Sequence, residues 1–370
     1  MERIRGQLVL EDHVAPGELA IDGALITDVQ LLPDSAQGGP FISPGFVDVH
    51  VHGWGGHSAM GDRAALDGMA RALLRRGVTS FLPTAVTAPL DELAAFAERV
   101  RSWMAAAPAD GAEPLGFNLE GPFLAQTRRG AHDPAFLLHP AVAAAALVEP
   151  LLPGLRVITI APELPGAQAL IAQLAGMGVI VSLGHSGATI DEARAGYSAG
   201  ATSTTHLFNA MTGIDHRNPG LAVAALLDDR VYTELIADGI HVDRALWPLI
   251  THLKPVERLL LVSDAIPLAG TGDGRGRLGS LEIEIHSERV TLAGTTTLAG
   301  SVLALDKAVR NMVGAGIALP AAVAAATRNP LDMLGITDRG RLAPGQRADF
   351  VELDAELNLR RVMLRGEWLA

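Results

Sequence analysis

From Pro44 onward the sequence alternates between short β-branched apolar stretches and longer alanine-rich or amphipathic stretches. The short stretches predict strands, and the longer ones predict helices. Strands that alternate with helices run parallel, and eight such βα units close a (β/α)8 barrel. The predicted strands are Phe46–His52, Val78–Thr84, Leu115–Glu120, Arg156–Ala161, Val179–His185, Ser203–Phe208, Val231–Asp238 and Arg258–Asp264.

Helices are predicted between these strands, with a final helix after the eighth strand and an insertion. Their expected ranges are Leu66–Arg76, Leu90–Ala107, Pro140–Leu152, Gln168–Met177, Ile190–Ala199, Leu221–Asp228, Ala245–Leu253 and Val302–Ala315.

The two chain ends differ from this pattern. Residues 1–43 and 338–370 hold short strand-like runs separated by glycine and proline turns, without a helical period. We therefore expect an α/β chain with a TIM barrel over residues 44–337 and a small β-sandwich domain built from both ends.

Charge and cysteine content exclude several classes of function. The chain carries 29 Lys+Arg against 41 Asp+Glu and has no long basic cluster, which argues against a nucleic-acid partner. No signal-peptide pattern and no apolar run of about 18 residues occurs, so we expect a cytoplasmic protein without a membrane partner. Because cysteine is absent, any metal must be held by histidine and carboxylate side chains.

A His-x-His pair ends the first predicted barrel strand. Alternate side chains of a strand share a face, so His50 and His52 point the same way. Such a pair alone is commonly an incidental feature of a half-buried strand. Five more strand ends carry polar residues, however, and barrel active sites lie at these ends. We therefore expect one rim to gather Glu120, His185, His206, His241 and Asp264 with the pair.

Imidazoles and carboxylates without thiolates suit a divalent metal. Zinc is the first expectation, and iron, cobalt or manganese would also fit. Such an ion lowers the pKa of a bound water to roughly 7. A neighbouring carboxylate can accept the water's proton and pass it to a leaving group, and we assign this role to Asp264. The alternative is an aspartate that only caps a loop.

The run Pro44-Gly-Phe-Val-Asp-Val-His-Val-His-Gly53, followed by His185, His206 and Asp264, resembles the amidohydrolase superfamily. Further motifs between residues 44 and 301 resemble, in the same order, the family of N-acetylglucosamine-6-phosphate deacetylases. These motifs are Leu119-Glu-Gly-Pro-Phe123, Gly130-Ala-His132, Gly184-His-Ser186, His206-Leu-Phe-Asn-Ala-Met211, Asp238-Gly-Ile-His-Val242 and Thr297-Leu-Ala-Gly-Ser301.

The resemblance implies one or two divalent ions per chain. Glu120, His185 and His206 would hold the main ion. His50 and His52 would hold the second, with Glu120 bridging and Asp264 close by. His132 would help the metal polarise the acetyl carbonyl. The implied substrate-binding residues are Ala131, His132, Asn209, Ala210, Arg217, His241, Leu298, Ala299 and Gly300.

The implied activity is a metal-dependent amide hydrolysis in amino-sugar catabolism. It would convert N-acetyl-D-glucosamine 6-phosphate, a small phosphosugar, into D-glucosamine 6-phosphate and acetate. The resemblance also implies a homodimer in which a loop of the partner helps close the phosphate pocket. Two alternatives stay open: deacetylation of N-acetylgalactosamine 6-phosphate or another N-acyl compound, and a non-catalytic barrel that binds a phosphosugar.

Overall fold

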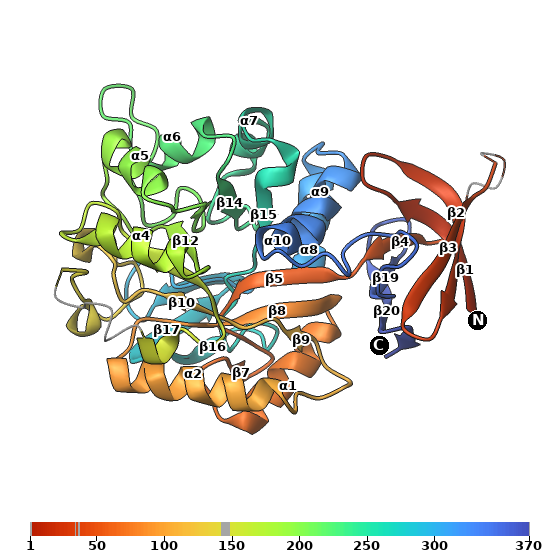
Figure 1. Ribbon diagram of the computed structural model, residues 1–370, viewed down its shortest axis with the longest axis horizontal. Helices are drawn as coiled ribbons and strands as arrows, with labels where there is room; N and C mark the ends of the chain where they lie inside the picture. Colours follow the sequence, from red (N-terminus) through yellow and green to blue (C-terminus); the bar gives the residue numbers. More distant parts are fainter. Residues whose placement is uncertain (1, 34, 36–37, 142–148, 370) are drawn as a thin grey trace.

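The computed structural model describes residues 2–33, 35, 38–141 and 149–369. Figure 1 shows two parts side by side: a strand-and-helix body, and a smaller group of strands at one end that contains both termini. Within the described ranges, no helix is both long and apolar enough to cross a membrane.

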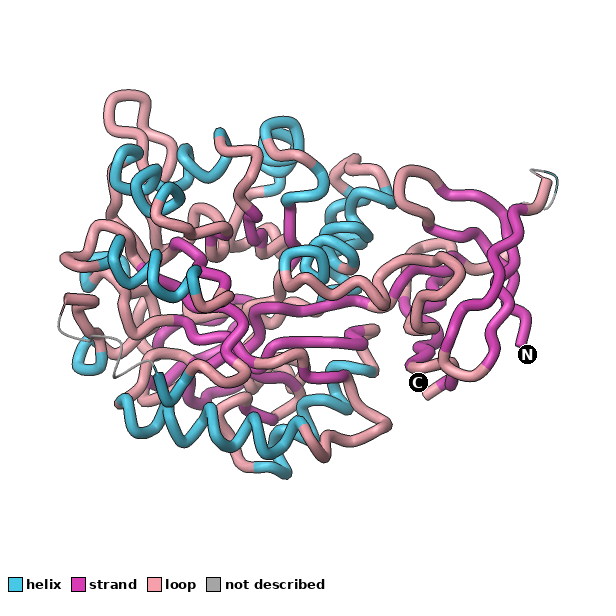
Figure 2. Tube along the Cα trace, viewed as in Figure 1, coloured by secondary structure: helices cyan, strands magenta, loops and turns pink. Residues whose placement is uncertain are grey.

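The body is a barrel of eight parallel strands, as predicted. The strands neighbour one another in chain order, and Figure 2 shows them running through the middle of the body with helices outside. The two outermost strands are joined by hydrogen bonds from Asp264 N to His50 O (2.9 Å) and from His52 N to Ala265 O (2.8 Å). The strands are β5 (Phe46–Val51), β8 (Val78–Ala85), β10 (Phe117–Glu120), β11 (Leu155–Ile160), β12 (Ile180–Leu183), β13 (Ser203–Thr204), β14 (Tyr232–Leu235) and β15 (Leu259–Leu261).

Most predicted helices occur, with ends shifted by a few residues. Local signals set some of these ends: Thr189 and Glu192 form a capping box at the start of α5. The helix expected over Pro140–Leu152 falls largely on residues 142–148, outside the described part of the chain. The helices are α1 (Arg63–Leu74), α2 (Leu90–Met104), α4 (Ala167–Gly176), α5 (Ile190–Ser198), α6 (Leu221–Leu227), α7 (Trp247–Leu253), α8 (Leu305–Gly314), α9 (Leu319–Ala326) and α10 (Arg328–Met333).

A hairpin insertion follows the last barrel strand. Its antiparallel sheet consists of β16 (Gly274–Leu278), β17 (Leu281–His286) and β18 (Arg289–Leu292). The turn between the first two strands lies against the loop after β10, where Ser280 Oγ donates to Asp133 Oδ2 at 2.7 Å. Shorter strands β6 (Gly53–Trp54), β7 (His57–Ser58) and β9 (Glu113–Pro114) flank the barrel.

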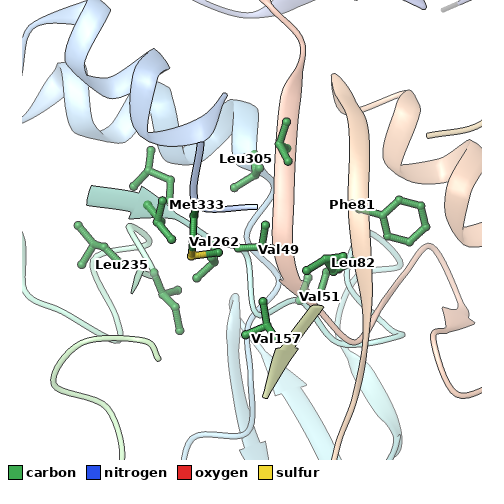
Figure 3. Close-up of a cluster of buried hydrophobic side chains, with 14 of the residues drawn as sticks. Val49, Val51, Phe81, Leu82, Val157, Leu235, Val262, Leu305 and Met333 are labelled. Carbon is green, nitrogen blue, oxygen red and sulfur yellow. The ribbon is translucent and has the colours of Figure 1, made fainter. Parts of the chain in front are cut away.

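One apolar core binds the barrel strands to the helices. Both faces of β5 and β8 are buried, which explains why these strands read as nearly continuous apolar runs. Figure 3 shows side chains from several strands gathered with those of α8 and α10. The labelled members are Val49, Val51, Phe81, Leu82, Val157, Leu235, Val262, Leu305 and Met333.

The chain ends form one seven-stranded sheet around a second core. Its order is β21-β20-β19-β4-β1-β2-β3, so strands from both ends meet where β4 pairs with β1 and β19. The core is made of Leu8, Leu19, Ile42, Phe350, Met363 and their apolar neighbours. The strands are β1 (Glu2–Val9), β2 (Val14–Asp22), β3 (Leu25–Leu31), β4 (Phe41–Pro44), β19 (Phe350–Leu353), β20 (Leu359–Leu364) and β21 (Glu367–Trp368). The predicted boundaries at 43/44 and 337/338 remain predictions.

A partly buried charge cluster joins the barrel edge to the C-terminal segment. Glu113 Oε2 lies 3.0 Å from Arg339 Nη1, 2.5 Å from Arg347 Nη1 and 2.9 Å from Arg365 Nη2. Burial opposes ionisation of Glu113, but these arginines outweigh it and lower its pKa from 4.5 to about 2. Glu113 therefore stabilises the fold as an anion.

We expect Glu113→Gln to lower the free energy of unfolding at pH 7 by on the order of 1–3 kcal/mol. Because the folded-state pKa of Glu113 is depressed, its stabilisation is fully present at pH values above the unfolded-state pKa. It is lost as the pH falls through the folded-state pKa. The gap between wild type and variant should therefore narrow below pH 4.5. Urea unfolding across this range measures it, with Glu98→Gln, an exposed partner of Arg101, as control. A gap that stays constant with pH would contradict the assignment.

Candidate active site

The predicted metal ligands all lie at or just beyond the C-terminal ends of barrel strands. Glu120 ends β10, while His185 and His206 follow β12 and β13 by two residues each. All three side chains are buried at the mouth of the barrel. The pair on β5 and Asp264 after β15 lie at the same rim, and their assignment as metal ligands stays a prediction.

Glu120 lies at the centre of the group. Its Oε1 is 2.9 Å from His185 Nε2 and 2.8 Å from His206 Nε2, and these two nitrogens are 3.0 Å apart. A tetrahedral zinc ion with bonds of about 2.0–2.2 Å separates its ligand atoms by about 3.3 Å. The three atoms therefore have a spacing close to that of ligands sharing one ion.

A second group shares the same carboxylate. His52 Nε2 is 3.2 Å from Glu120 Oε2 and 3.1 Å from Asp264 Oδ1. His50 Nε2 lies 3.5 Å from Glu120 Oε1 and 3.7 Å from Asp264 Oδ1. In each group the ligand atoms lie within 4.8 Å of one another, so the residues could hold two ions with Glu120 between them.

Hydrogen bonds on the far side of three imidazoles fix their tautomers. His50 Nδ1 donates to Glu234 Oε2 (3.0 Å), His52 Nδ1 to the Thr84 carbonyl (3.1 Å) and His185 Nδ1 to the Arg128 carbonyl (2.9 Å). Because these oxygens accept, Nδ1 carries a proton, and in the neutral imidazole the Nε2 lone pair points at the shared centre. This arrangement is typical of histidines that bind metals.

Electrostatics indicates that the centre requires positive charge. Burial alone would lower the pKa of His50 and His52, but neighbouring carboxylates have the larger effect. They raise the pKa of His50 well above its usual value and the pKa of His52 to about 9. Burial would raise the pKa of Glu120, yet the surrounding imidazoles hold it well below its usual value. His50 Nε2, moreover, is buried without a hydrogen-bond partner. Protons on the imidazoles or a divalent cation could supply the charge, so the donor set fits a metal.

Unusual backbone geometry aims several of these side chains. The φ angles of His185, His206 and Asp264 are +47°, +24° and +49°, in the left-handed region that non-glycine residues rarely adopt. At β5 the pairing with β8 shifts register between Asp48 and Val51, around His50. Such irregularities are common beside active sites, where they redirect side chains.

His132 has the opposite tautomer. Its Nδ1 accepts from the Thr87 N–H at 3.2 Å, so its proton is on Nε2, which lies 3.2 Å from Glu120 Oε2. The side chain is buried. It therefore presents a hydrogen-bond donor beside the metal-ligand groups, as stabilisation of a developing oxyanion requires.

A cavity of about 360 Å³ opens above these groups. Two predicted substrate residues are not among those that line it: Ala299 is fully buried, and Arg217 lies on an exposed loop. A Cβ on residue 300, which lines the cavity, would come within 2.8 Å of the Asp264 carbonyl oxygen. Glycine at this position therefore permits the close approach of the two backbone segments. The predicted residues that line the cavity are His52, Glu120, Ala131, His132, His185, His206, Asn209, Ala210, His241, Asp264, Leu298 and Gly300.

Several residues at the site escaped the sequence analysis. Glu234 and Asp48 are buried beneath the ligand groups, while Arg128 and Leu278 line the cavity. A carboxylate inside the apolar stretch around β14 was the signal for Glu234, because a buried acid requires a partner. Nothing in the sequence marks Leu278, which arrives from the hairpin insertion.

Comparison with known proteins shows the family to which the chain belongs. The sequence model of the amidohydrolase family matches residues 41–369. The chain is 38% identical to an N-acetylgalactosamine-6-phosphate deacetylase of Escherichia coli O157:H7, covering 97% of this chain and 95% of that protein. It is 39% identical to an N-acetylglucosamine-6-phosphate deacetylase of Bos taurus, covering 98% and 92%.

A solved structure extends the comparison to three dimensions. A mutant of a Mycobacterium smegmatis N-acetyl-D-glucosamine-6-phosphate deacetylase, in complex with N-acetyl-D-glucosamine 6-phosphate, superposes with a TM-score of 0.90. That chain is 36% identical to this one, and the superposition covers 100% of this chain and 99% of that one. The chain therefore belongs to the amidohydrolase family, in the branch that contains these deacetylases.

Proposed function

We propose that the chain is a metal-dependent hydrolase that converts N-acetyl-D-glucosamine 6-phosphate to D-glucosamine 6-phosphate and acetate in amino-sugar catabolism. The observation that carries the proposal is the convergence of Glu120, His185 and His206 at one point, under a cavity that Asp264 and His132 also line. Kinship with deacetylases of phosphorylated N-acetyl sugars gives the substrate class.

Glu120, His185 and His206 would hold the main divalent ion, with zinc the first candidate from the nitrogen and oxygen donor set. His50 and His52 would hold a second, with Glu120 shared. A bound ion would supply Lewis acidity, which favours ionisation of water near neutral pH and polarises an amide carbonyl.

Asp264 would act as the proton carrier. Burial would raise its pKa, but the hydrogen bond with His52 and the charge of His50 lower it, so the carboxylate is ionised and able to accept a proton. It would take a proton from the attacking water and later give it to the departing amine. His132 would donate its Nε2 hydrogen to the acetyl oxygen as negative charge develops there.

The sugar and its phosphate would occupy the outer part of the cavity. His241 lines the cavity with its Nδ1 2.6 Å from Asp238 Oδ2, which orients the ring, and Asn209 and Ala210 line the cavity as well. A phosphate dianion calls for an arginine, whose fork binds two oxygens. Arg217 is the predicted one, although it is not among the cavity-lining residues of its own chain.

We propose that the chain forms a homodimer in which Arg217 reaches the partner's cavity. Its exposed loop also exposes Ile214, and α7 exposes Leu249 and Leu253, four residues apart on one face of the helix. The two leucines on α7 form an exposed apolar face that is suited to an interface. We also propose a cytoplasmic location, where a phosphorylated sugar is retained by its charge.

The substrate assignment predicts the pattern of acetate release by metal-reconstituted enzyme. Release should be fastest from N-acetylglucosamine 6-phosphate. It should be at least about tenfold slower from the unphosphorylated sugar, which lacks the phosphate that Arg217 is proposed to bind. Treatment with a chelator should abolish it, and zinc should restore it. N-acetylgalactosamine 6-phosphate, the substrate named for the Escherichia coli relative, tests which sugar epimer this chain prefers. Equal rates with and without the phosphate would overturn the substrate assignment.

Asp264→Asn should reduce kcat by about 10²–10⁴-fold, because the isosteric amide cannot accept a proton. Binding of the phosphosugar, measured by calorimetry, should survive. Asp354→Asn, at an exposed turn of the β-domain, serves as control and should leave kcat unchanged. Unaltered turnover in Asp264→Asn would remove the assigned base, whereas a wild-type protein that binds the phosphosugar without releasing acetate would favour the non-catalytic binding protein.

The dimer proposal predicts complementation between two impaired variants. Arg217→Ala should raise KM about 10–100-fold with little change in kcat. When Arg217→Ala and Asp264→Asn subunits are mixed and allowed to exchange, half of the dimers are mixed and each has one complete site. At substrate concentrations well below the wild-type KM, where Arg217→Ala sites contribute little, activity should therefore return to about a quarter of the wild-type value. No recovery in verified mixed dimers would mean that Arg217 serves its own subunit or none.

A further inference from the structure

The carboxylate of Glu234 lies directly behind both groups of predicted metal ligands. Glu234 belongs to β14, the seventh barrel strand, and its side chain is only 1% exposed. Within the described residues, its Oε2 receives two hydrogen bonds, from His50 Nδ1 at 3.0 Å and from the His206 backbone N–H at 3.1 Å. One oxygen thus contacts a member of each group.

The contact with His50 determines what that imidazole can bind. Because a carboxylate only accepts, the His50 proton is held on Nδ1, and Nε2 turns its lone pair toward Glu120 and Asp264. A cation bound at Nε2 makes the Nδ1–H a stronger donor, so the hydrogen bond to Glu234 and the metal bond reinforce one another.

The contact with His206 is of a different kind. Residue 206 has a φ of +24°, and its N–H donates to the Glu234 side chain while the next N–H, of Leu207, donates to the Glu234 carbonyl at 2.8 Å. Glu234 therefore holds a strained corner of the chain through backbone atoms. A neutral amide oxygen could accept the His206 bond equally well, whereas the charge matters for His50.

Resting on the proposed metal centre, we propose that Glu234 is a positioning residue that sets the affinity of the second ion, bound by His50, His52 and Asp264, with far less effect on the first. The negative charge of Glu234 strengthens binding of the second ion through its hydrogen bond with His50. For the first ion only the shape of the side chain matters, because Glu234 contacts His206 through a backbone N–H. Glu234 thereby determines whether the chain works with one ion or two.

The test compares metal binding by wild type and Glu234→Gln, with Glu18→Gln as control. Glu18 is a similarly buried glutamate, 5% exposed, in the sheet of the chain ends. Zinc competition against a chromophoric chelator, with metal analysis, gives the number of ions and both dissociation constants. We expect Glu234→Gln to weaken the second site about 10–100-fold, with less than about threefold change at the first. Glu18→Gln should bind zinc as wild type does.

A companion variant and a stability measurement separate positioning from a general structural role. His50→Asn should remove the second site, and adding Glu234→Gln to it should not weaken the first site further. Without metal, the melting temperature of Glu234→Gln should equal or exceed that of wild type, because a buried charge is removed. Adding zinc should raise the melting temperature of the variant by less than it raises that of wild type.

Two results would overturn this inference alone: unchanged binding of both ions in Glu234→Gln, or equal weakening of both sites. A metal-free Glu234→Gln protein that fails to fold would also overturn it, since the role would then be structural. If wild-type protein binds no divalent ion, the proposed function fails with it, so the two failures are distinguishable.

Discussion

The structure of the site depends on one buried carboxylate that faces five imidazoles. Glu120 brings its two oxygens within 3.5 Å of Nε2 atoms from strands all around the barrel mouth. Neutral rings cannot satisfy this carboxylate by hydrogen bonds alone, because three of them carry their proton on the far nitrogen. The arrangement becomes stable when positive charge enters the centre.

The fold supports this charge balance by restricting movement around it. Left-handed φ angles at His185, His206 and Asp264 are conformations that a chain adopts only when the surrounding packing holds them. The rigid parallel strands and their helices supply that packing, while Glu234 and the Thr84 and Arg128 carbonyls hold the rings. Loops from distant parts of the chain then cover the centre and leave a cavity large enough for a sugar phosphate.

Much of this could be predicted from the sequence, because the signals are local. Alternation of strand and helix predicted the barrel, and polar residues ending apolar strands predicted the candidate ligands, since the C-terminal ends of parallel strands meet at one rim. The pairing of the two chain ends was also predicted, because both ends hold short, turn-bounded strand-like runs. Helices α9 and α10 were missed because their alanine-rich and proline-containing stretches carry no amphipathic period.

Other features were not predictable because they depend on tertiary contacts. The tautomers of the histidines follow from which oxygen lies behind each ring, and Leu278 reaches the cavity only through the folding of an insertion. The family resemblance assigns Arg217 to phosphate binding, but it gives no location for the guanidinium group. Roles that require geometry, such as that of Glu234, need coordinates.

The central claim is that Glu120, His185 and His206 hold a divalent ion. Anomalous diffraction at the zinc absorption edge from crystals of the zinc-loaded protein tests it most directly. The account predicts a peak at bonding distance, about 2.0–2.2 Å, from Glu120 Oε1, His185 Nε2 and His206 Nε2. A fully loaded crystal with its only peak elsewhere, or with none, would contradict it.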